Sequence, residues 1–120
     1  MIAVIGLSSD PARASYQVAA YMQEHGYRII PVNPREKDVL GEKCYPDLCS
    51  VPESVEIVDI FRRPRYVPHA VAEAIYVGAK VVWMQLGIVH EAAARRAREA
   101  GLEVVMDRCL KVEHRRLSGG

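Results

Sequence analysis

The sequence predicts a three-layer α/β fold, in which helices cover both faces of a five-stranded parallel sheet. Two observations support this fold class. Strand and helix signals alternate along the whole chain of 120 residues, a pattern typical of parallel sheets joined by right-handed crossovers. Residues 3–34 also follow the strand–loop–helix–strand order that opens dinucleotide-binding folds. We therefore expect a Rossmann-like architecture with the strand order 3-2-1-4-5.

The first unit consists of strand 2–5, a helix that ends near His25, and strand 28–32. Glycine is favoured directly after the last residue of a helix, so Gly26 predicts that the helix ends at about His25. Two starts are compatible with the sequence. Either Asp10 and Pro11 cap and begin the helix, or Ser15 is the cap. We prefer Ser15, because residues 8–14 then form a loop that can wrap around a ligand.

The next segment, residues 35–54, is expected to be irregular, because Gly41, Pro46 and Pro52 interrupt it. Beyond it, short apolar runs predict buried strands and amphipathic runs predict helices. One of these apolar runs is interrupted by Asp59. The expected strands are 57–61, 80–86 and 103–106. The expected helices run from near Pro68 to Gly78 and over 89–100. We expect residues 107–117 to be partly helical and residues 118–120 to be frayed.

Length and composition predict a single domain that spans residues 1–120. Half of the residues are hydrophobic and 26% are charged, as in a globular protein. The net charge of +1 gives no broad basic field for nucleic acid. No apolar run approaches the roughly 20 residues of a membrane span. The N-terminal residues enter the first expected strand without the basic-then-apolar layout of a signal peptide. We expect a cytoplasmic protein that binds neither nucleic acid nor membrane.

Cysteine usage agrees with this location. The chain has three cysteines, an odd number, which favours free thiols in a reducing compartment. Cys44 and Cys49 have no histidine or further cysteine nearby to complete a zinc site. We therefore expect no metal site.

Ligands of such sheets bind beyond the carboxyl ends of the strands, near the point where the strand order reverses. After the first strand, Gly6 allows a tight turn and close approach of a ligand, and Arg13 offers a fork that matches phosphate oxygens. With nearby hydroxyls and the amides of a helix N-terminus, this loop is a candidate pyrophosphate site. The alternative is a polar surface loop whose serines only cap the helix. The candidate residues are Gly6, Leu7, Ser8, Ser9, Arg13, Ser15 and Tyr16.

The end of the second strand reads Val32, Asn33, Pro34 and Arg35. Proteins that bind NAD usually carry an acidic residue here for the ribose hydroxyls. Arg35 instead favours a ribose that carries a phosphate, as in NADP and coenzyme A. The alternative is that Arg35 is an ordinary solvated charge.

Phe61, Arg62 and Arg63 follow the third strand. The arginines are candidates for further phosphate oxygens, and Phe61 for contact with a base or a pantetheine chain; the alternative is a solvated basic turn. After the fourth strand, Gln85 and Gly87 are expected to face the same site. The sequence contains no nucleophile elbow, no Walker lysine and no paired carboxylates. It therefore predicts a binding site and no catalytic residue.

Several stretches together identify a family resemblance. They are Val4-Ile-Gly-Leu-Ser-Ser9, Arg13 with Ser15-Tyr16, Ile30-Pro-Val-Asn-Pro34, Val58-Asp-Ile-Phe-Arg-Arg-Pro64, Val81-Val-Trp-Met-Gln-Leu-Gly-Ile88 and Val105-Met-Asp-Arg-Cys-Leu110. With these stretches the chain resembles the small stand-alone CoA-binding proteins related to the N-terminal domain of the succinyl-CoA synthetase α-subunit. The resemblance implies a Rossmann-like CoA-binding domain. It implies that residues 6–9, Arg13 and Ser15 surround the phosphates, while residues 32–34 and 61–63 flank the adenosine. The catalytic histidine of the synthetase lies on a second domain with no counterpart in this sequence, so ligase activity is not expected.

The leading hypothesis is a non-catalytic cytoplasmic protein that binds coenzyme A or an acyl-CoA. One alternative is a component of an NADP-binding oxidoreductase. Another is a redox or regulatory protein in which Cys44, Cys49 or Cys109 forms a mixed disulfide with the CoA thiol; Cys109 follows Arg108, whose charge favours a reactive thiolate. A homodimer or a complex with a partner enzyme is compatible with the sequence.

Overall fold

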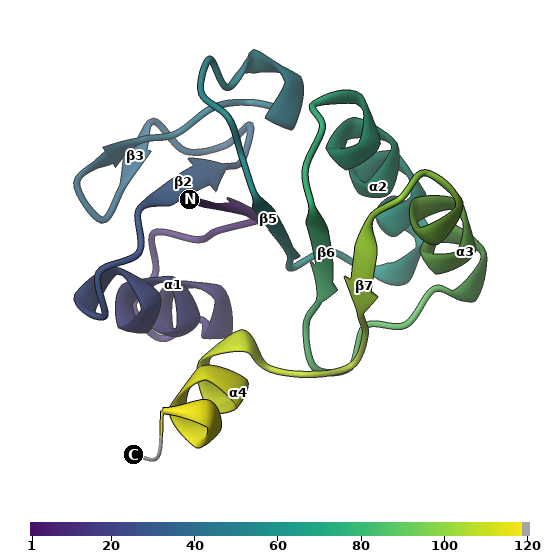
Figure 1. The fold of residues 1–120 in the computed structure, drawn as a ribbon. Helices are drawn as coiled ribbons and strands as arrows, with labels where there is room; N and C mark the ends of the chain where they lie inside the picture. The colour runs from purple at the N-terminus through teal and green to yellow at the C-terminus, as the bar shows by residue number, and fades with distance from the viewer. Residues whose placement is uncertain (119–120) are drawn as a thin grey trace.

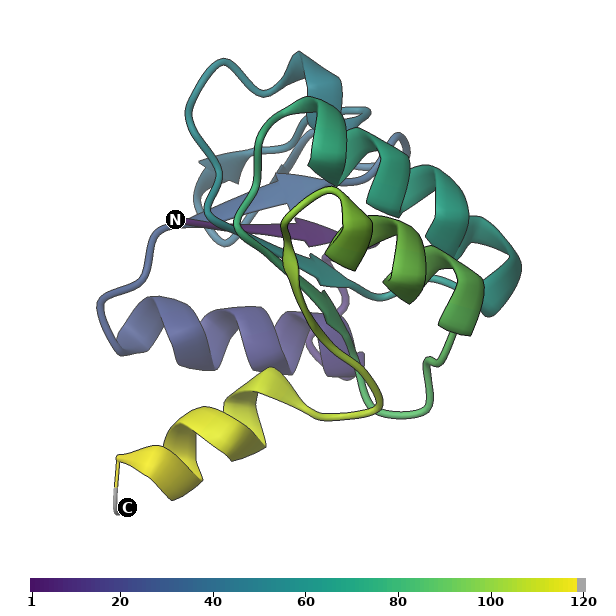
Figure 2. The ribbon, with the colours of Figure 1, turned by 45° about the vertical axis from the view of Figure 1, so that its right-hand side comes forward.

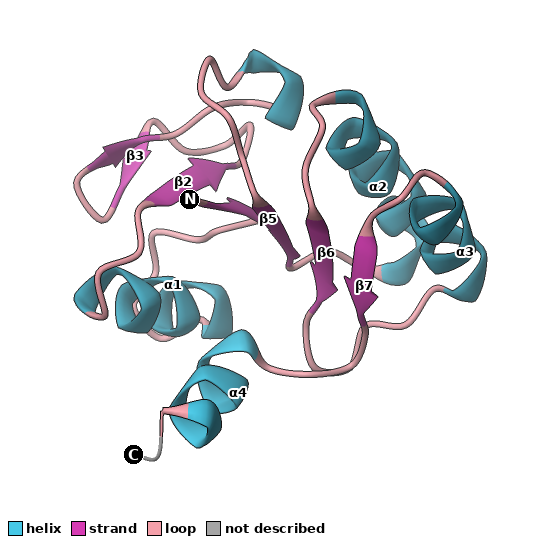
Figure 3. Cartoon of the chain, in the orientation of Figure 1, coloured by secondary structure: helices cyan, strands magenta, loops and turns pink. Residues whose placement is uncertain are grey.

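The fold was obtained as a computed structural model that describes residues 1–118. Five parallel strands form one sheet, in the spatial order β2-β1-β5-β6-β7 (Figures 1 and 3). In chain order these strands are β1 Ile2–Ile5, β2 Ile29–Val32, β5 Ile57–Ile60, β6 Val81–Met84 and β7 Glu103–Val105. Nearly every side chain of the first three strands is buried, as expected for parallel strands covered on both faces.

Two pairs of helices cover the sheet, as Figure 2 shows. α1 (Ala14–Glu24) and α4 (Leu110–Leu117) lie on one face, and α2 (Val67–Tyr76) and α3 (Glu91–Glu99) on the other. Alternate side chains along the strands pack into two apolar clusters, one on each face. The predicted three-layer architecture is therefore confirmed.

The position of the third predicted strand differs from the expected strand order. Numbered along the chain, the five sheet strands lie in the order 2-1-3-4-5, because β5 pairs with β1 and not beyond β2. The later part of the connection to β5 packs on the face that also carries α2, where Leu48 and Val55 are buried. A right-handed crossover on that face leads back across β1. The outer side of β2 is covered by Tyr45, whose N–H donates to the Pro31 carbonyl oxygen over 3.0 Å.

The segment between β2 and β5 is also less irregular than expected. It contains a short antiparallel hairpin, β3 (Asp38–Val39) and β4 (Glu42–Lys43), followed by a 3₁₀ turn, η1 (Leu48–Ser50). A second 3₁₀ turn, η2 (Pro64–Tyr66), leads into α2.

The start of α1 corrects the preferred helix cap. Arg13, and not Ser15, is the N-cap residue, and its side chain makes no capping bond. Ser15 lies in the first turn, where its Oγ accepts a hydrogen bond from the Ser8 N–H over 3.0 Å. The loop after β1 is thereby folded back onto the helix. At the other end of the chain, Ser118 caps α4, and the predicted fraying of 119–120 lies outside the described residues.

The middle strand carries a buried acid, Asp59. In register it lies between Val4 of β1 and Trp83 of β6. Its side chain is fully buried, and neither carboxyl oxygen has a hydrogen-bond partner among the described residues. Burial raises the pKa of the Asp59 carboxyl well above its usual range. Among residues 1–118, no helix has the length and apolar character needed to cross a bilayer.

Candidate functional site

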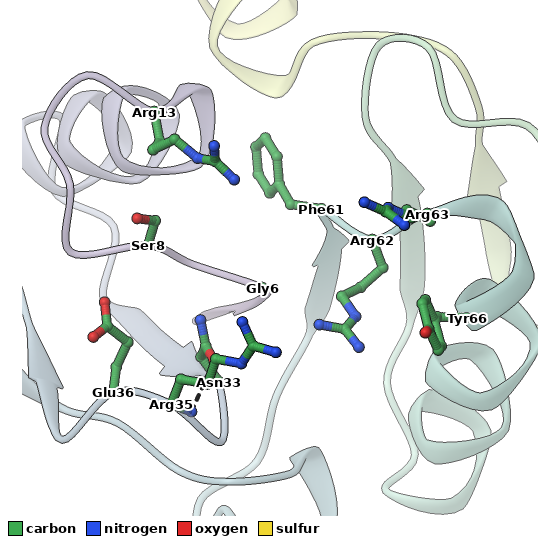
Figure 4. A pocket seen from close by; sticks show the side chains of 10 residues that line it. All are labelled: Gly6, Ser8, Arg13, Asn33, Arg35, Glu36, Phe61, Arg62, Arg63 and Tyr66. Carbon is green, nitrogen blue, oxygen red and sulfur yellow. Dashed lines mark hydrogen bonds between the residues drawn. The ribbon is translucent and has the colours of Figure 1, made fainter.

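A large cavity opens where the connections of neighbouring strands diverge. β1 leads into α1 on one face of the sheet, whereas β5, beside it, leads into α2 on the opposite face. This is the switch point at which open parallel sheets bind ligands. The cavity measures about 580 Å³ (Figure 4), and the residues that line it are Gly6, Ser8, Arg13, Asn33, Arg35, Glu36, Phe61, Arg62, Arg63 and Tyr66.

Gly6 forms the floor between the two strands. Its N–H donates to the Val32 carbonyl oxygen over 2.8 Å, and its φ of +86° is in the left-handed region. A Cβ on this residue would lie 2.3 Å from the Phe61 carbonyl oxygen. The close approach of β1 and β5 therefore requires glycine here, in addition to any need of a ligand.

The loop after β1 is held by its own hydrogen bonds. The Asp10 N–H donates to the Ser8 Oγ over 3.0 Å, and the Ala12 N–H donates to the Asp10 Oδ1 over 2.9 Å. The Ser9 N–H donates to the Glu36 carboxylate over 2.6 Å, which ties this loop to the one after β2. Groups of the protein itself therefore hold the wall of the cavity in place.

Asn33 joins the same two loops from the β2 side. Its Nδ2 donates to the Leu7 carbonyl oxygen and its Oδ1 accepts from the Arg35 N–H, each over 3.0 Å. Asparagine suits this position because its short amide donates and accepts at once. These two hydrogen bonds hold the backbone at Arg35, whose side chain lines the cavity (Figure 4).

The cavity is strongly cationic. Four arginines line it, from the loops after β1, β2 and β5, against the single carboxylate of Glu36. None of these four guanidinium groups forms an ion pair with another described residue. The Arg62 guanidinium lies 4.8 Å from the ring centroid of Tyr66, a cation–π contact that orients it. Unpaired guanidinium groups in a concave site are suited to phosphate oxygens.

A second hollow of about 250 Å³ adjoins the first and shares Gly6, Arg62 and Tyr66 with it. Its further lining is mostly apolar, with polar groups at Asp47, His69 and Glu73; the apolar residues are Ile5, Val32, Pro34, Pro46 and Ala70. Such a hollow is suited to a flat, largely apolar group with polar edges.

Most of the residues predicted from the strand ends lie at these two hollows. Eight of them line the cavity and two line the second hollow; the eight are Gly6, Ser8, Arg13, Asn33, Arg35, Phe61, Arg62 and Arg63, and the two are Val32 and Pro34. The structure thus brings together side chains from three separate loops.

Four predicted residues of the first loop and helix lie elsewhere. Leu7 is fully buried in the core, and Ser15 is buried beneath the loop, where it binds the Ser8 N–H. Ser9 is exposed and contributes its N–H to Glu36. Tyr16 borders a different shallow hollow, lined by residues of α1 and by Lys111 of α4.

Gln85 and Gly87, after β6, also do not reach the cavity. Gln85 is only 4% exposed, and its Oε1 accepts from the Leu110 N–H over 3.1 Å. The Gly87 N–H donates to the Asp107 Oδ1 over 2.7 Å. Both groups hold the segment that leads into α4.

Sequence reasoning missed Glu36 and Tyr66, which both line the cavity. Glu36 directly follows Arg35, so an acid was present near the position where NAD-binding proteins carry one. Tyr66 follows the arginine cluster through the turn η2, whose sharp bend returns the ring toward the cavity.

The cysteines do not line the cavity. Cys44 is buried, its Sγ is 3.4 Å from the Asn33 carbonyl oxygen, and burial raises its pKa. Partial desolvation and neighbouring Glu73 raise the pKa of Cys49. Arg108, beside Cys109, is bonded to Glu113 over 2.8 Å. Within the described part of the chain, no group of three or more His, Cys, Asp or Glu side chains could hold a metal ion.

The fold and the cavity together define a Rossmann-like domain with a cationic cavity at its switch point. Residues 1–115 match the family model described as a CoA binding domain. The chain therefore belongs to the CoA-binding domain family.

Relatives of this chain include both small proteins and enzyme subunits. It is 42% identical over 113 residues to the uncharacterized protein YneT of Bacillus subtilis, covering 94% of this chain and 84% of that protein. It is 35% identical over 82 residues to the α-subunit of an ADP-forming acetate–CoA ligase II of Pyrococcus furiosus, covering 68% of this chain but 18% of that subunit. A solved hypothetical protein from Pyrococcus horikoshii superposes with a TM-score of 0.96 at 45% identity, covering 98% of this chain and 83% of that one.

Proposed function

We propose that this protein binds coenzyme A, with the phosphates in the arginine-lined cavity. The observation that carries this proposal is the convergence of four unpaired arginines on one cavity at the switch point of the sheet. Coenzyme A carries a pyrophosphate and a ribose 3′-phosphate, and several guanidinium groups suit such a polyanion. The family of the chain supports coenzyme A over other nucleotides.

The two hollows suggest how the ligand lies. The pyrophosphate is proposed to lie at Ser8, Arg13 and the loop after β1, and the ribose phosphate at Arg35. The second hollow, with Val32 and Pro34, then receives the adenine. The adenine amino group is a donor that the carboxylate of Asp47 or Glu73 can accept.

The proposed role is binding in the cytoplasm without catalysis. The lining of the cavity consists mainly of arginines, an amide and aromatic rings, which supports binding. Both hydroxyls of the lining already accept hydrogen bonds, that of Ser8 from the Asp10 N–H and that of Tyr66 from the Arg65 guanidinium. The acetate–CoA ligase relative is a much longer chain, of which this one matches a small part. All three cysteines are unpaired thiols, which supports a reducing compartment.

The test is calorimetric titration of purified, ligand-stripped protein with coenzyme A, with NADPH and ADP as comparators. We expect micromolar or tighter binding of coenzyme A and weaker binding of both comparators, because neither combines a 3′-phosphate with a pantetheine arm. Binding of NADPH without binding of coenzyme A would overturn the proposal and favour a component of an NADP-dependent oxidoreductase.

A further inference from the structure

A third hollow, of about 350 Å³, opens beside the ends of β6 and β7 and is not used by the proposed site. Leu86, Met106, Cys109 and Val112 line it, together with the charged residues Asp107, Arg108 and Glu113. Leu86 is 70% exposed and Val112 is 53% exposed. This hollow at the carboxyl edge of the sheet therefore exposes apolar side chains to solvent.

The charged groups of this hollow already have partners. Arg108 donates to Glu113 over 2.8 Å, and Arg116 lies 3.5 Å from the other oxygen of the same carboxylate. The hydrogen bond from Arg108 lowers the pKa of Glu113, so the acid is ionised and paired. Asp107 accepts from the Gly87 N–H. The groups left without partners are therefore apolar, which favours an apolar occupant.

The hollow lies on the same edge of the sheet as the arginine-lined cavity. β5 and β7 are separated only by β6, so their ends are roughly 10 Å apart at the usual strand spacing. Phe61, from the cavity, and Cys109, from the hollow, pack against one apolar cluster on the face of α1 and α4. Phe61 and Cys109 therefore lie on the same face of the sheet, and a flexible chain that leaves the cavity past Phe61 starts on the face where Cys109 lies.

We propose that this hollow binds the acyl group of an acyl-CoA, with a hydrocarbon chain as the preferred occupant. The inference rests on the proposed function, since it needs the phosphates of the ligand in the arginine-lined cavity. Its consequence is selectivity: the protein binds acyl thioesters more tightly than free coenzyme A.

The first test is calorimetric titration with coenzyme A and with acetyl-, butyryl- and hexanoyl-CoA. We expect affinity to rise with chain length, by up to about fourfold for each methylene that becomes buried. Val112→Ser should reduce this gain for hexanoyl-CoA at least several-fold while leaving the affinity for free coenzyme A unchanged. The matched control is Leu117→Ser, which removes an exposed apolar side chain from the same helix outside the hollow.

A second test uses the thiol in the hollow. Alkylation by iodoacetamide, followed by mass mapping, should be slowed at Cys109 by hexanoyl-CoA more than by coenzyme A. Cys49 is exposed and lies outside the hollow, so its alkylation should respond equally to the two ligands.

Equal affinities for coenzyme A and its thioesters would overturn the acyl site and leave the proposed function standing. A gain with chain length that survives Val112→Ser, with no preferential protection of Cys109, would also overturn it. If Val112→Ser instead dissociates an oligomer in light scattering without changing acyl-CoA affinity, the hollow is an interface between copies. Absence of binding by coenzyme A and by every thioester would overturn the proposed function itself.

Discussion

At the ends of β1 and β5, guanidinium groups line a cavity without ion-pair partners, whereas at the end of β6 Gln85 and Gly87 hydrogen-bond to other segments of the protein. There, Gln85 binds the Leu110 N–H and Gly87 binds Asp107. Both regions are carboxyl ends of neighbouring parallel strands, and both carry a glycine and polar side chains.

The difference comes from the path of the chain after each strand. The chain after β1 and β5 turns away into helices on opposite faces and leaves a crevice. The chain after β7 instead returns across the end of β6 toward α4, and its backbone and side-chain groups pair with the polar groups there. Position at a strand end therefore suggests a ligand site only where no other segment of the protein uses the same hydrogen-bonding groups.

The two glycines give the sharpest way to test this contrast. Gly6 and Gly87 have the same φ of +86°, but an added Cβ meets the Phe61 carbonyl oxygen at 2.3 Å only at Gly6. Gly87→Ala should cost about 1–2 kcal/mol for the left-handed backbone. Gly6→Ala adds overpacking and should cost about 2–5 kcal/mol in all. Urea denaturation midpoints measure both, and equal losses would contradict the close approach of β1 and β5.

Removal of one cavity arginine should affect binding and not folding. Arg13→Ala should weaken binding of coenzyme A by about 1.5–3 kcal/mol, because a charge-assisted hydrogen bond to a phosphate is lost. The control is Arg95→Ala on α3, whose side chain is exposed and outside the cavity. An unchanged affinity in calorimetry would remove Arg13 from the binding site.

Gln85 should show the opposite behaviour. Gln85→Met keeps the size of the side chain but removes the acceptor of the Leu110 N–H, so it should lower the free energy of unfolding by about 1–3 kcal/mol. Its affinity for coenzyme A, measured on the folded variant, should stay at the wild-type value. A weakened affinity with unchanged stability would mean that the end of β6, like the ends of β1 and β5, contributes to ligand binding.

Asp59 lies in β5, the strand beside β6, and should make stability depend on pH. Its pKa is raised in the folded state by burial. As pH rises above the unfolded-state pKa of about 3.9, the unfolded chain loses this proton first, so stability falls until the pH reaches the raised folded-state pKa. The slope from one such group is at most about 1.4 kcal/mol per pH unit.

Asp59→Asn cannot ionise and should lack this part of the pH dependence. Denaturation of both proteins at several pH values above 4 measures the difference. Parallel stability curves for Asp59→Asn and wild type would show that the carboxyl finds a partner or water in solution.

Much of the fold could be predicted from local patterns. Each sheet strand lies within or near its expected range, because short apolar runs between glycines leave few alternatives. The position of β5 in the sheet could not be predicted, because residues 35–56 show no hydrophobic periodicity that indicates which face of the sheet they cover. Buried Leu48 and the contact of Tyr45 with β2 decide the order, and both are long-range packing effects.

The candidate site was predictable to a similar degree. The arginines after β1, β2 and β5 followed from the rule that strand ends converge. The side chain of Gln85 was misplaced because its partner, the Leu110 N–H, lies 25 residues further along the chain. Glu36 and Tyr66 were missed because the turns that bring them to the cavity are set by tertiary contacts, among them the bond from the Ser9 N–H to Glu36.

Trp83 is the only tryptophan of the chain, and its Nε1 donates to the Arg108 carbonyl oxygen over 2.7 Å. Its ring packs against the same apolar cluster as Phe61 and Cys109. The protein therefore carries a single indole fluorophore, hydrogen-bonded to the segment that leads into α4. Its emission reports, without any label, on whether the segment before α4 stays docked when a ligand enters.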